Sequence, residues 1–246
     1  MQNYHPPVDL LKDRVILVTG AGQGLGKTAA LAFARHGATV ILHGRTIAKL
    51  ESTYDEIMEQ GGMEPAILPL DYNLTNETEL QNFAQAIETG LTRLDGIFHG
   101  ASHFSPLTPL ANQGLDTWLT HLRVNIGVPA ALTRACFPLL KKSPQASVIF
   151  LTETHALEPQ AYWGAFAVCK SALTTLNHIW ASELGTTPQV RINLCWPGPV
   201  ASPLRARSHP GESPAHLPAA ESLAPHFLYL MGPDSAHLNG ERYQCK

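Results

Sequence analysis

Short apolar runs alternate with helix-length segments along the whole chain. The runs are rich in β-branched residues and lie at 14–19, 38–43, 66–70, 96–99, 147–152 and 190–195, with a weaker one at 241–245. Runs this short and rich in β-branched residues are typical of strands buried on both faces of a parallel sheet. Helices are predicted between the runs, at 24–36, 46–60, 76–90, 113–140, 163–184 and 218–231. This alternation predicts an α/β fold with right-handed crossovers, in which helices cover both faces of a doubly wound parallel sheet of about seven strands.

The composition fits a single globular domain over residues 1–246. Apolar residues make up 44% of the chain and charged residues 15%, which excludes a fully disordered chain. There is no run of roughly 18 apolar residues, so we expect no membrane-spanning helix. The proline-rich segment 197–218 is the one shift in composition, and we predict that it is irregular and forms a substrate lid loop.

Charge and cysteine content narrow the classes of partner. The 17 basic and 20 acidic side chains give a net charge of −3, which provides no general attraction to nucleic acid or to an anionic membrane. The polar first residues lack the apolar core of a signal peptide. Four cysteines are scattered without a C-x-x-C pair, as in a chain that is kept reduced. We therefore expect a cytoplasmic protein with neither a nucleic-acid nor a membrane partner.

A glycine-rich turn, T-G-A-G-Q-G-L-G at 19–26, follows the first predicted strand and opens the first predicted helix. Such a turn lets backbone N–H groups approach a pyrophosphate, and the helix N-terminus adds the positive end of its dipole. A second strand follows about twenty residues further on, as in known dinucleotide sites. The context predicts a Rossmann-like dinucleotide site, and the alternative is a glycine turn that holds no ligand.

The residues after the second predicted strand indicate which dinucleotide binds. An NAD site usually has an Asp or Glu roughly 20 residues after the glycines, which holds the ribose 2′-hydroxyl. The stretch V-I-L-H-G-R-T contains no acidic residue, and its Arg45 can pair with a 2′-phosphate. Lys49 can assist from the next helix, although Arg45 could also be a solvated residue at the helix start. Asp71, after the third strand, can accept a hydrogen bond from an adenine amino group or can cap the next turn.

Together with four further segments, the glycine motif resembles the short-chain dehydrogenase/reductase family over almost the whole chain. L-D-G-I-F-H-G-A-S (94–102) resembles the strand-four motif N-N-A-G, and V-N-I (124–126) resembles the segment with the family's active-site Asn. F-A-V-C-K (166–170) falls on Y-x-x-x-K, and W-P-G-P-V-A-S (196–202) resembles the P-G-x-x-x-T stretch that contacts the nicotinamide. The resemblance implies that NADP(H) is the cofactor and that it is bound by Gly20, Gly22, Gln23, Gly24, Leu25, Gly26, Arg45, Asp71, Gly100, Lys170, Pro197, Gly198, Val200 and Ser202.

The catalytic positions that the resemblance implies are Asn125, Glu153, Phe166 and Lys170. The family's reaction transfers a hydride between the nicotinamide and a carbonyl or alcohol carbon. In the family a Tyr donates the proton, a Lys lowers the pKa of that Tyr and holds the ribose, a Ser positions the oxygen, and an Asn orders a helix kink and a proton relay. Lys170 and Asn125 match this pattern, but Phe166 stands at the Tyr position and Glu153 at the Ser position. Phe166 cannot donate a proton, a contribution that is worth roughly 10²- to 10⁴-fold in rate.

Glu153 admits three interpretations. An ionised carboxylate repels the negative charge that develops on a carbonyl oxygen, by about 4 kcal/mol at roughly 4 Å and an effective dielectric of about 20. Burial can instead raise its pKa and leave it protonated, as a donor. An ion pair with Lys170 would leave no acid at all.

Two other residues could supply the missing acid. Tyr162 lies four residues before Phe166, and His155 follows Glu153 by two, so it shares a face with Glu153 if the strand continues. Histidine can donate a proton near neutral pH, although a chain with 12 histidines places some of them near any pocket.

Metal and nucleophile chemistry have little support in the sequence. His99 and His103 flank the strand-four loop, but no ligand spacing supports a metal there, and we expect none. Cys169, beside Lys170, is expected to be a small buried residue rather than a nucleophile.

Two hypotheses about function follow from these residues. The first is a family member that binds NADP(H) but is impaired in hydride transfer, that is, a pseudoenzyme. The second is an active NADP-dependent carbonyl reductase that uses a non-standard acid such as Tyr162 or His155. An interaction module without nucleotide would leave the glycine turn without a role.

The resemblance also implies a homodimer or homotetramer. Such an oligomer would form through the predicted helices near 113–140 and 163–184. The second of these carries apolar residues on more than one face, namely Trp163, Phe166, Leu173, Leu176, Ile179 and Trp180.

Overall fold

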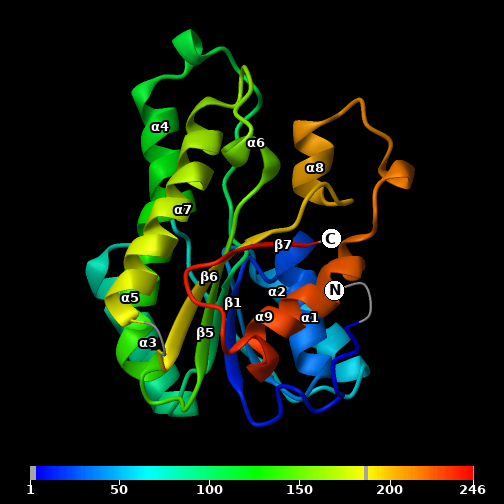
Figure 1. Cartoon of the computed structure of the whole chain (residues 1–246), viewed down its shortest axis with the longest axis vertical. Helices are drawn as coiled ribbons and strands as arrows, with labels where there is room; N and C mark the ends of the chain where they lie inside the picture. Colours follow the sequence, from blue (N-terminus) through cyan, green and yellow to red (C-terminus); the bar gives the residue numbers. More distant parts are fainter. Residues whose placement is uncertain (1–3, 186–187, 246) are drawn as a thin grey trace.

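The computed structural model describes residues 4–185 and 188–245, and seven strands lie within them. They run in parallel in the order β3-β2-β1-β4-β5-β6-β7 (Figure 1). The predicted doubly wound parallel sheet is therefore confirmed. The strands are β1 (Val15–Thr19), β2 (Thr39–Gly44), β3 (Ala66–Pro69), β4 (Gly96–His99), β5 (Ala146–Leu151), β6 (Val190–Trp196) and β7 (Arg242–Gln244).

Helices form a layer on each face of the sheet (Figure 1). One layer contains α1 (Gly24–Arg35), α2 (Ile47–Glu59) and α9 (Ala224–Met231). The other contains α3 (Glu77–Leu91), α4 (Leu115–Leu122), α5 (Val128–Leu140) and α7 (Gly164–Leu184). Two short helices, α6 (Thr154–Leu157) and α8 (Pro203–Ser208), lie beyond the carboxyl ends of the strands. No helix of the described residues is long and apolar enough to cross a membrane.

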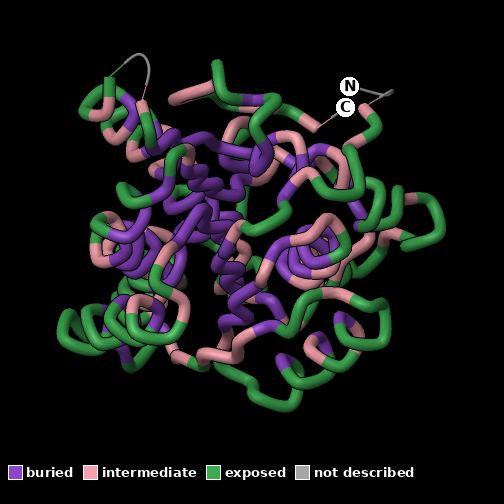
Figure 2. Tube along the Cα trace, turned by 90° about the horizontal axis from the view of Figure 1, so that it is seen from below, coloured by how far each residue is buried: buried purple, intermediate pink, exposed green. Residues whose placement is uncertain are grey.

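Strands β1 to β6 each contribute to two hydrophobic cores, because successive side chains of a strand point to opposite faces. Ile16 and Val18 of β1 pack in the core with Phe33 of α1, and Leu17 packs in the other core with Leu132 of α5. Full burial of such a side chain stabilises the fold by roughly 1.5–3 kcal/mol. Figure 2 shows this arrangement, with buried trace in the centre and exposed trace around it. The two-sided burial explains why the central strand segments are apolar on both faces.

The helix predicted over 113–140 is interrupted. α4 ends at Leu122, a π-helical turn follows at Arg123–Gly127, and α5 begins at Val128. Single π-helical turns occur frequently at functional sites. Asn125 lies in this turn, so its side chain leaves the helix in a direction that a regular α-helix would not give it.

The segment 197–218 is more regular than predicted, because it contains α8. The Ser202 hydroxyl accepts a hydrogen bond from the backbone N–H of Arg205 at 3.1 Å, and Pro203 occupies the first turn. Serine at the cap and proline in the first turn both favour the start of a helix. The abundance of proline in the segment concealed this local signal.

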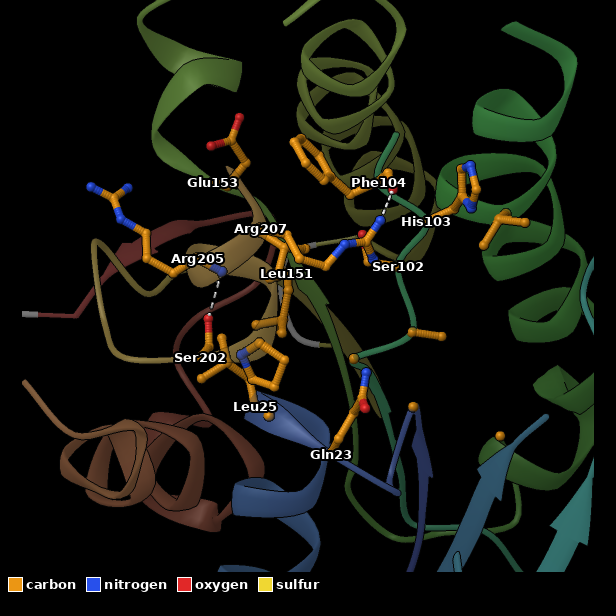
Figure 3. A pocket seen from close by; sticks show the side chains of 18 of the residues that line it. Gln23, Leu25, Ser102, His103, Phe104, Leu151, Glu153, Ser202, Arg205 and Arg207 are labelled. Carbon is orange, nitrogen blue, oxygen red and sulfur yellow. Dashed lines mark hydrogen bonds between the residues drawn. The ribbon is translucent and has the colours of Figure 1, made fainter. Parts of the chain in front are cut away.

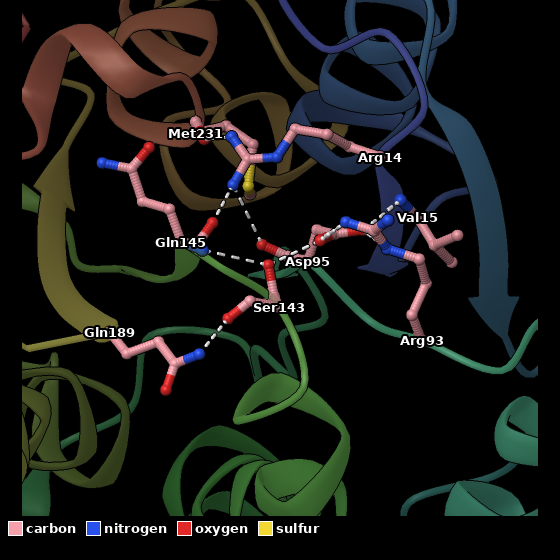
Figure 4. A network of polar contacts seen from close by, with 8 residues as sticks. All are labelled: Arg14, Val15, Arg93, Asp95, Ser143, Gln145, Gln189 and Met231. Carbon is pink, nitrogen blue, oxygen red and sulfur yellow. Dashed lines mark hydrogen bonds and ion pairs between the residues drawn. The ribbon is translucent and has the colours of Figure 1, made fainter.

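A buried carboxylate, Asp95, joins three segments at the amino-terminal edge of the sheet (Figure 4). Its Oδ2 accepts hydrogen bonds from the Val15 N–H at 2.9 Å and from Arg93 Nε at 2.8 Å. Its Oδ1 accepts from Arg93 Nη2 at 2.6 Å and from Ser143 Oγ at 2.5 Å. Burial opposes ionisation, but the bonds from Arg93, Ser143 and Val15 outweigh it and hold the pKa of Asp95 below its usual value.

Candidate functional site

A cavity of about 420 Å³ opens at the carboxyl ends of the strands, where the strand order reverses between β1 and β4. Its volume lies within the usual range of small-molecule sites, and crevices at this position bind ligands in open α/β sheets. Most of the site residues predicted from the sequence line it: Gly20, Gly22, Gln23, Gly24, Leu25, Arg45, Asp71, Gly100, Glu153, Phe166, Lys170, Pro197, Gly198, Val200 and Ser202. Gly26 and Asn125 do not line the cavity and act from behind its wall.

The glycine turn connects β1 to the N-terminus of α1. Gly20 has a φ of +69°, and a Cβ on it would lie 2.8 Å from the Ala101 nitrogen. A Cβ on Gly26 would lie 2.2 Å from the Gly20 carbonyl oxygen, so this residue lets the helix approach the strand. α1 begins at Gly24 without a side-chain cap, and the N–H groups of its first turn have no partner within the helix. The turn therefore offers backbone donors to an anion.

Two basic side chains lie beside this turn. Arg45 follows β2, is exposed and lines the cavity. Lys49 Nζ donates a hydrogen bond to Gln23 Oε1 at 2.5 Å. The pair places positive charge next to the N-terminus of α1, where a second phosphate group could be recognised.

Asp71 lines the same cavity, and its carboxylate is already used locally. Its Oδ1 accepts hydrogen bonds from the backbone N–H of Asn73 at 2.9 Å and from Asn73 Nδ2 at 3.2 Å. This is the turn-capping interaction considered from the sequence. Among the described residues, Asp71 Oδ2 accepts no hydrogen bond, so this oxygen can accept one from a ligand.

Asn125 fixes the loop that follows β4. Its Oδ1 accepts hydrogen bonds from the His103 N–H at 2.9 Å and from Ser102 Oγ at 3.0 Å. Its Nδ2 donates to the His103 carbonyl at 2.9 Å and to His121 Nδ1 at 3.1 Å. The loop also bonds to β1, where the Ala101 N–H donates to Thr19 Oγ1 at 3.1 Å. Asn125 is thus a positioning residue for the cavity wall.

Lys170 projects from α7 into the buried end of the cavity. Its Nζ donates a hydrogen bond to the Leu151 carbonyl at 3.0 Å and lies 5.9 Å from the centre of the Phe166 ring. Burial lowers the pKa of Lys170 to about 8, and the nearby Glu153 opposes the shift. A partly neutralised lysine can exchange a proton near physiological pH.

Glu153 lies where β5 has already ended. The strand stops at Leu151, and Glu153 occupies the position before α6, so the continued strand that would have placed His155 on the face of Glu153 is not formed. Among the described residues, Glu153 Oε1 is buried without a hydrogen-bond partner, and no ion pair joins Glu153 to Lys170. Burial raises the pKa of Glu153, against the opposing effect of His155 and Lys170. The ion pair considered from the sequence is therefore wrong.

Phe166 belongs to a small aromatic cluster with Phe104 and Trp163. Its ring meets Phe104 edge to face at 5.2 Å between centroids, and Trp163 lies 6.0 Å away. These side chains are buried and form a satellite core, against which Leu204 of α8 packs. The wall beside Glu153 is therefore apolar and has no hydroxyl group at the position of Phe166.

The two alternative acids do not line the cavity. The Tyr162 side chain is 57% exposed, and the residue adopts a φ of +75° in the turn before α7. His155 is buried, and its ring is tilted against that of Trp163 with ring centroids 3.8 Å apart. A direct proton transfer from either side chain into the cavity would need a rearrangement.

Three further residues were considered from the sequence as metal ligands or as a nucleophile, namely His99, His103 and Cys169. His99 stacks on Phe150 with ring centroids 4.7 Å apart, and its Nε2 lies 2.8 Å from Thr133 Oγ1. His103 lines the cavity wall. Burial raises the pKa of the Cys169 thiol to about 11, which leaves it unreactive. Within residues 4–185 and 188–245 no group of three or more His, Cys, Asp or Glu side chains is arranged to hold a metal ion.

Two arginines of α8 were missed in the sequence. Arg207 Nη2 donates to the Phe104 carbonyl at 2.6 Å, with its guanidinium 5.7 Å from the centre of the Phe104 ring. Arg205 makes a two-bond ion pair with Glu212, at 2.6 and 3.0 Å. Both line the cavity (Figure 3). They follow the 196–202 motif by three and five residues but belong to no motif, and only the cap at Ser202 could have suggested a helix there.

Comparisons with known proteins agree on one family. The model of the short chain dehydrogenase family matches residues 14–213. The oxidoreductase YciK of Escherichia coli K12 is 36% identical over 244 residues, which cover 99% of this chain and 96% of that protein. The structure of a short chain dehydrogenase from Pseudomonas syringae has a TM-score of 0.96 and 39% identity, with 99% of each chain covered. A short chain dehydrogenase from Shigella flexneri 2a, crystallised with NADP, has a TM-score of 0.93 and 35% identity, covering 97% of this chain and 99% of that chain. Because the family model spans most of the described residues and the relatives match nearly end to end, this chain belongs to the short chain dehydrogenase family.

Proposed function

We propose that this protein binds NADP(H) in the cavity at the carboxyl ends of the strands and reduces carbonyl compounds only weakly by the family's usual route. The observation that carries the proposal is a contrast within one cavity. The glycine turn and Lys170 are in place, whereas Phe166 and Glu153 stand where the family has its Tyr and Ser.

The cofactor part of the proposal rests on the fit of the site to a dinucleotide phosphate. The N–H groups of 22–26 would hold the pyrophosphate, and Arg45 and Lys49 the 2′-phosphate. Asp71, Gly100 and the segment 197–202 would complete the site. When bound, the cofactor supplies a hydride at its nicotinamide carbon. The relative crystallised with NADP supports this assignment.

NADP(H) should bind at least roughly tenfold more tightly than NAD(H), because a charge-assisted pairing of Arg45 with a phosphate adds to the binding free energy. Calorimetric titration of the wild-type protein with both reduced cofactors measures the preference. Arg45→Ala should lose most of it, while Arg35→Ala, at the far end of α1, should retain it. Equal affinities for the two cofactors, or an unchanged preference in Arg45→Ala, would contradict the assignment.

The catalytic part of the proposal rests on the charge that develops during reduction. A carbonyl oxygen becomes negative as the hydride arrives, and it needs a proton donor and hydrogen bonds. Phe166 supplies neither. Glu153, when ionised, repels the oxyanion, and among the described residues its buried Oε1 has no hydrogen-bond partner. Lys170 and Asn125 hold the surrounding geometry but do not replace the donor.

The segment 197–218 would act as a lid over the substrate end of the cavity. α8 lies across the opening, and Arg207 joins it to the loop after β4 through the Phe104 carbonyl (Figure 3). The packing of Leu204, the Arg207 guanidinium over the Phe104 ring and the contact of His209 with Trp163 also connect α8 to the aromatic cluster. Opening of the lid would break these contacts and expose the cavity.

A homodimer or homotetramer would form through one apolar surface. Leu115, Leu119 and Leu122 share a face of α4 and are 72%, 52% and 40% exposed. α4 packs against α7, whose Val168 and Ile179 are also exposed. Trp163, Phe166 and Leu173, expected from the sequence to reach such an interface, are instead buried within the subunit. Exposed apolar side chains on two helices that pack together are typical of interaction surfaces.

Sedimentation at micromolar concentration should show a dimer or tetramer. The double variant Leu119→Glu/Ile179→Glu should dissociate it, because it places charges on the apolar surface. Met58→Glu, at an exposed apolar position of α2 in the other helix layer, is the matched control and should leave the assembly unchanged. A monomeric wild-type protein would refute the proposal.

A further inference from the structure

The end of the cavity beside α6 and α7 combines a carboxyl group with an aromatic wall. Glu153 Oε1 is buried without a partner among the described residues, and Phe104, Trp163 and Phe166 form the neighbouring wall. Figure 3 shows Glu153 and Phe104 at the opposite end of the cavity from Gln23 and Leu25. A carboxylate oxygen that is buried without a hydrogen-bond partner is costly, so a ligand that pairs with it gains affinity.

The positive side chains around Glu153 are engaged elsewhere. Lys170 Nζ donates to the Leu151 carbonyl, and Arg205 is paired with Glu212. Arg207 donates to the Phe104 carbonyl, and Figure 3 shows it between Ser102 and Leu151, on the Gln23 side of Glu153. The His155 ring, on α6, packs against Trp163. These groups surround Glu153, and none of them forms an ion pair with it.

The chemistry of a cationic substrate fits this arrangement. Reduction of a carbonyl creates negative charge beside Glu153, which the carboxylate opposes. Reduction of an iminium ion removes positive charge, so the carboxylate favours binding of the substrate and no proton donor is needed. Aromatic faces also attract organic cations. The two substitutions that oppose carbonyl reduction are thus compatible with one change of substrate class.

We propose that this end of the cavity binds flat, apolar organic cations of the iminium class, with Glu153 as the counter-ion and Phe104, Trp163 and Phe166 as the aromatic wall. The reduction of such a ligand rests on the proposed binding of NADP(H), whereas the binding of the cation does not. In the reduction, a hydride from the reduced nicotinamide forms the C–H bond at the iminium carbon, and the π pair of the C=N bond becomes the nitrogen lone pair. The products are a neutral tertiary amine and the oxidised cofactor, and no proton is consumed.

Calorimetric binding of two matched probes tests the site without turnover. At about pH 8, 2-methylisoquinolinium is charged and isoquinoline is neutral, while their shapes are alike. The cation should bind roughly 10- to 100-fold more tightly, because an ionised partner for Glu153 is a charge-assisted contact in a buried site. Glu153→Gln should remove this preference. Glu158→Gln, at an exposed position five residues further along, should keep it.

Oxidation of NADPH with a second pair of compounds tests the reaction. 2-Methyl-3,4-dihydroisoquinolinium should be reduced at least roughly tenfold faster than the ketone 1-tetralone, because its reduction needs no acid. Equal binding of the two isoquinoline probes, tighter binding of 1-naphthoate than of the cation, or faster reduction of the ketone would each overturn the proposal. Loss of NADPH binding with the cation preference intact would instead overturn the proposed function alone.

Discussion

The double variant Phe166→Tyr/Glu153→Ser should reduce ketones and diketones roughly 10²- to 10⁴-fold faster than the wild-type protein, and by more than the product of the two single gains. Phe166→Tyr returns a proton donor close to Lys170, whose Nζ lies 5.9 Å from the Phe166 ring centre. With Glu153 still present, its carboxylate raises the pKa of the new phenol and opposes the lowering by Lys170. Glu153→Ser removes that repulsion and adds the hydroxyl that positions the carbonyl oxygen. Groups that act as one unit give non-additive kinetics.

NADPH oxidation by all four proteins against the same carbonyl panel measures this coupling. Titration of NADPH binding in each variant separates a change in catalysis from a change in cofactor affinity. Lys170→Ala in the double variant is the internal control, and it should abolish the gain, because the phenol then loses the cation that lowers its pKa. Rapid turnover by the wild-type protein that falls in Phe166→Tyr would show that another acid is at work, with Tyr162 and His155 the first to test.

The same double variant links the two substrate classes. If Glu153 is the counter-ion for a cationic ligand, Glu153→Ser should weaken the binding of 2-methylisoquinolinium while it raises carbonyl reduction. A general loss of stability would lower both cation binding and carbonyl reduction, so it would not explain a change in opposite directions. They would place the choice of substrate charge at this one position.

The fold was predictable because its strongest constraint is local. A strand buried on both faces needs mainly apolar residues on both of them, so the runs at 14–19 and 96–99 gave β1 and β4 to within one residue. The glycine turn was equally predictable, because the strand, the turn and the helix are adjacent in the sequence. Lys49 also approaches the turn in the structure, where a Cβ on Gly22 would lie 2.7 Å from its Cβ.

The substrate end of the cavity was harder to predict from the sequence, because it is assembled from segments that are far apart in the chain. The contact of Arg207 with Phe104 spans 103 positions and leaves no periodicity or motif in either segment. His155 was predicted to share a face with Glu153 on a continued strand. The chain instead turns into α6 after Glu153, so His155 lies on a helical turn and points elsewhere. Whether the charge of Glu153 is neutralised depends on its neighbours in space. These neighbours come from other parts of the chain, so the sequence around Glu153 does not reveal them.

The replacement Asp95→Ala is expected to produce the largest loss of stability, roughly 3 kcal/mol. It removes the acceptor for the Val15 N–H and for Ser143, both of which are buried, and it also removes the partner of Arg93. The Arg93 side chain is 40% exposed, so water can solvate it, and we place the cost at the lower end for a broken buried pair. In a chain of this length the loss corresponds to a fall in Tm of roughly 6–12 °C. Thermal and urea unfolding followed by circular dichroism measure both quantities.

The pH dependence of this loss identifies the carboxylate as its source. The pKa of Asp95 is lower in the folded chain than in the unfolded chain, where it is about 3.9, so its ionised form stabilises the fold above that pH. The difference in unfolding free energy between wild type and Asp95→Ala should therefore be constant above about pH 5 and should shrink as the pH falls through the lowered pKa. Glu77→Ala breaks the exposed ion pair with Arg134 and should change the stability by less than about 1 kcal/mol. An Asp95→Ala variant as stable as Glu77→Ala would show that the network at the amino-terminal edge contributes little to holding β1, β4 and the 143–145 segment together.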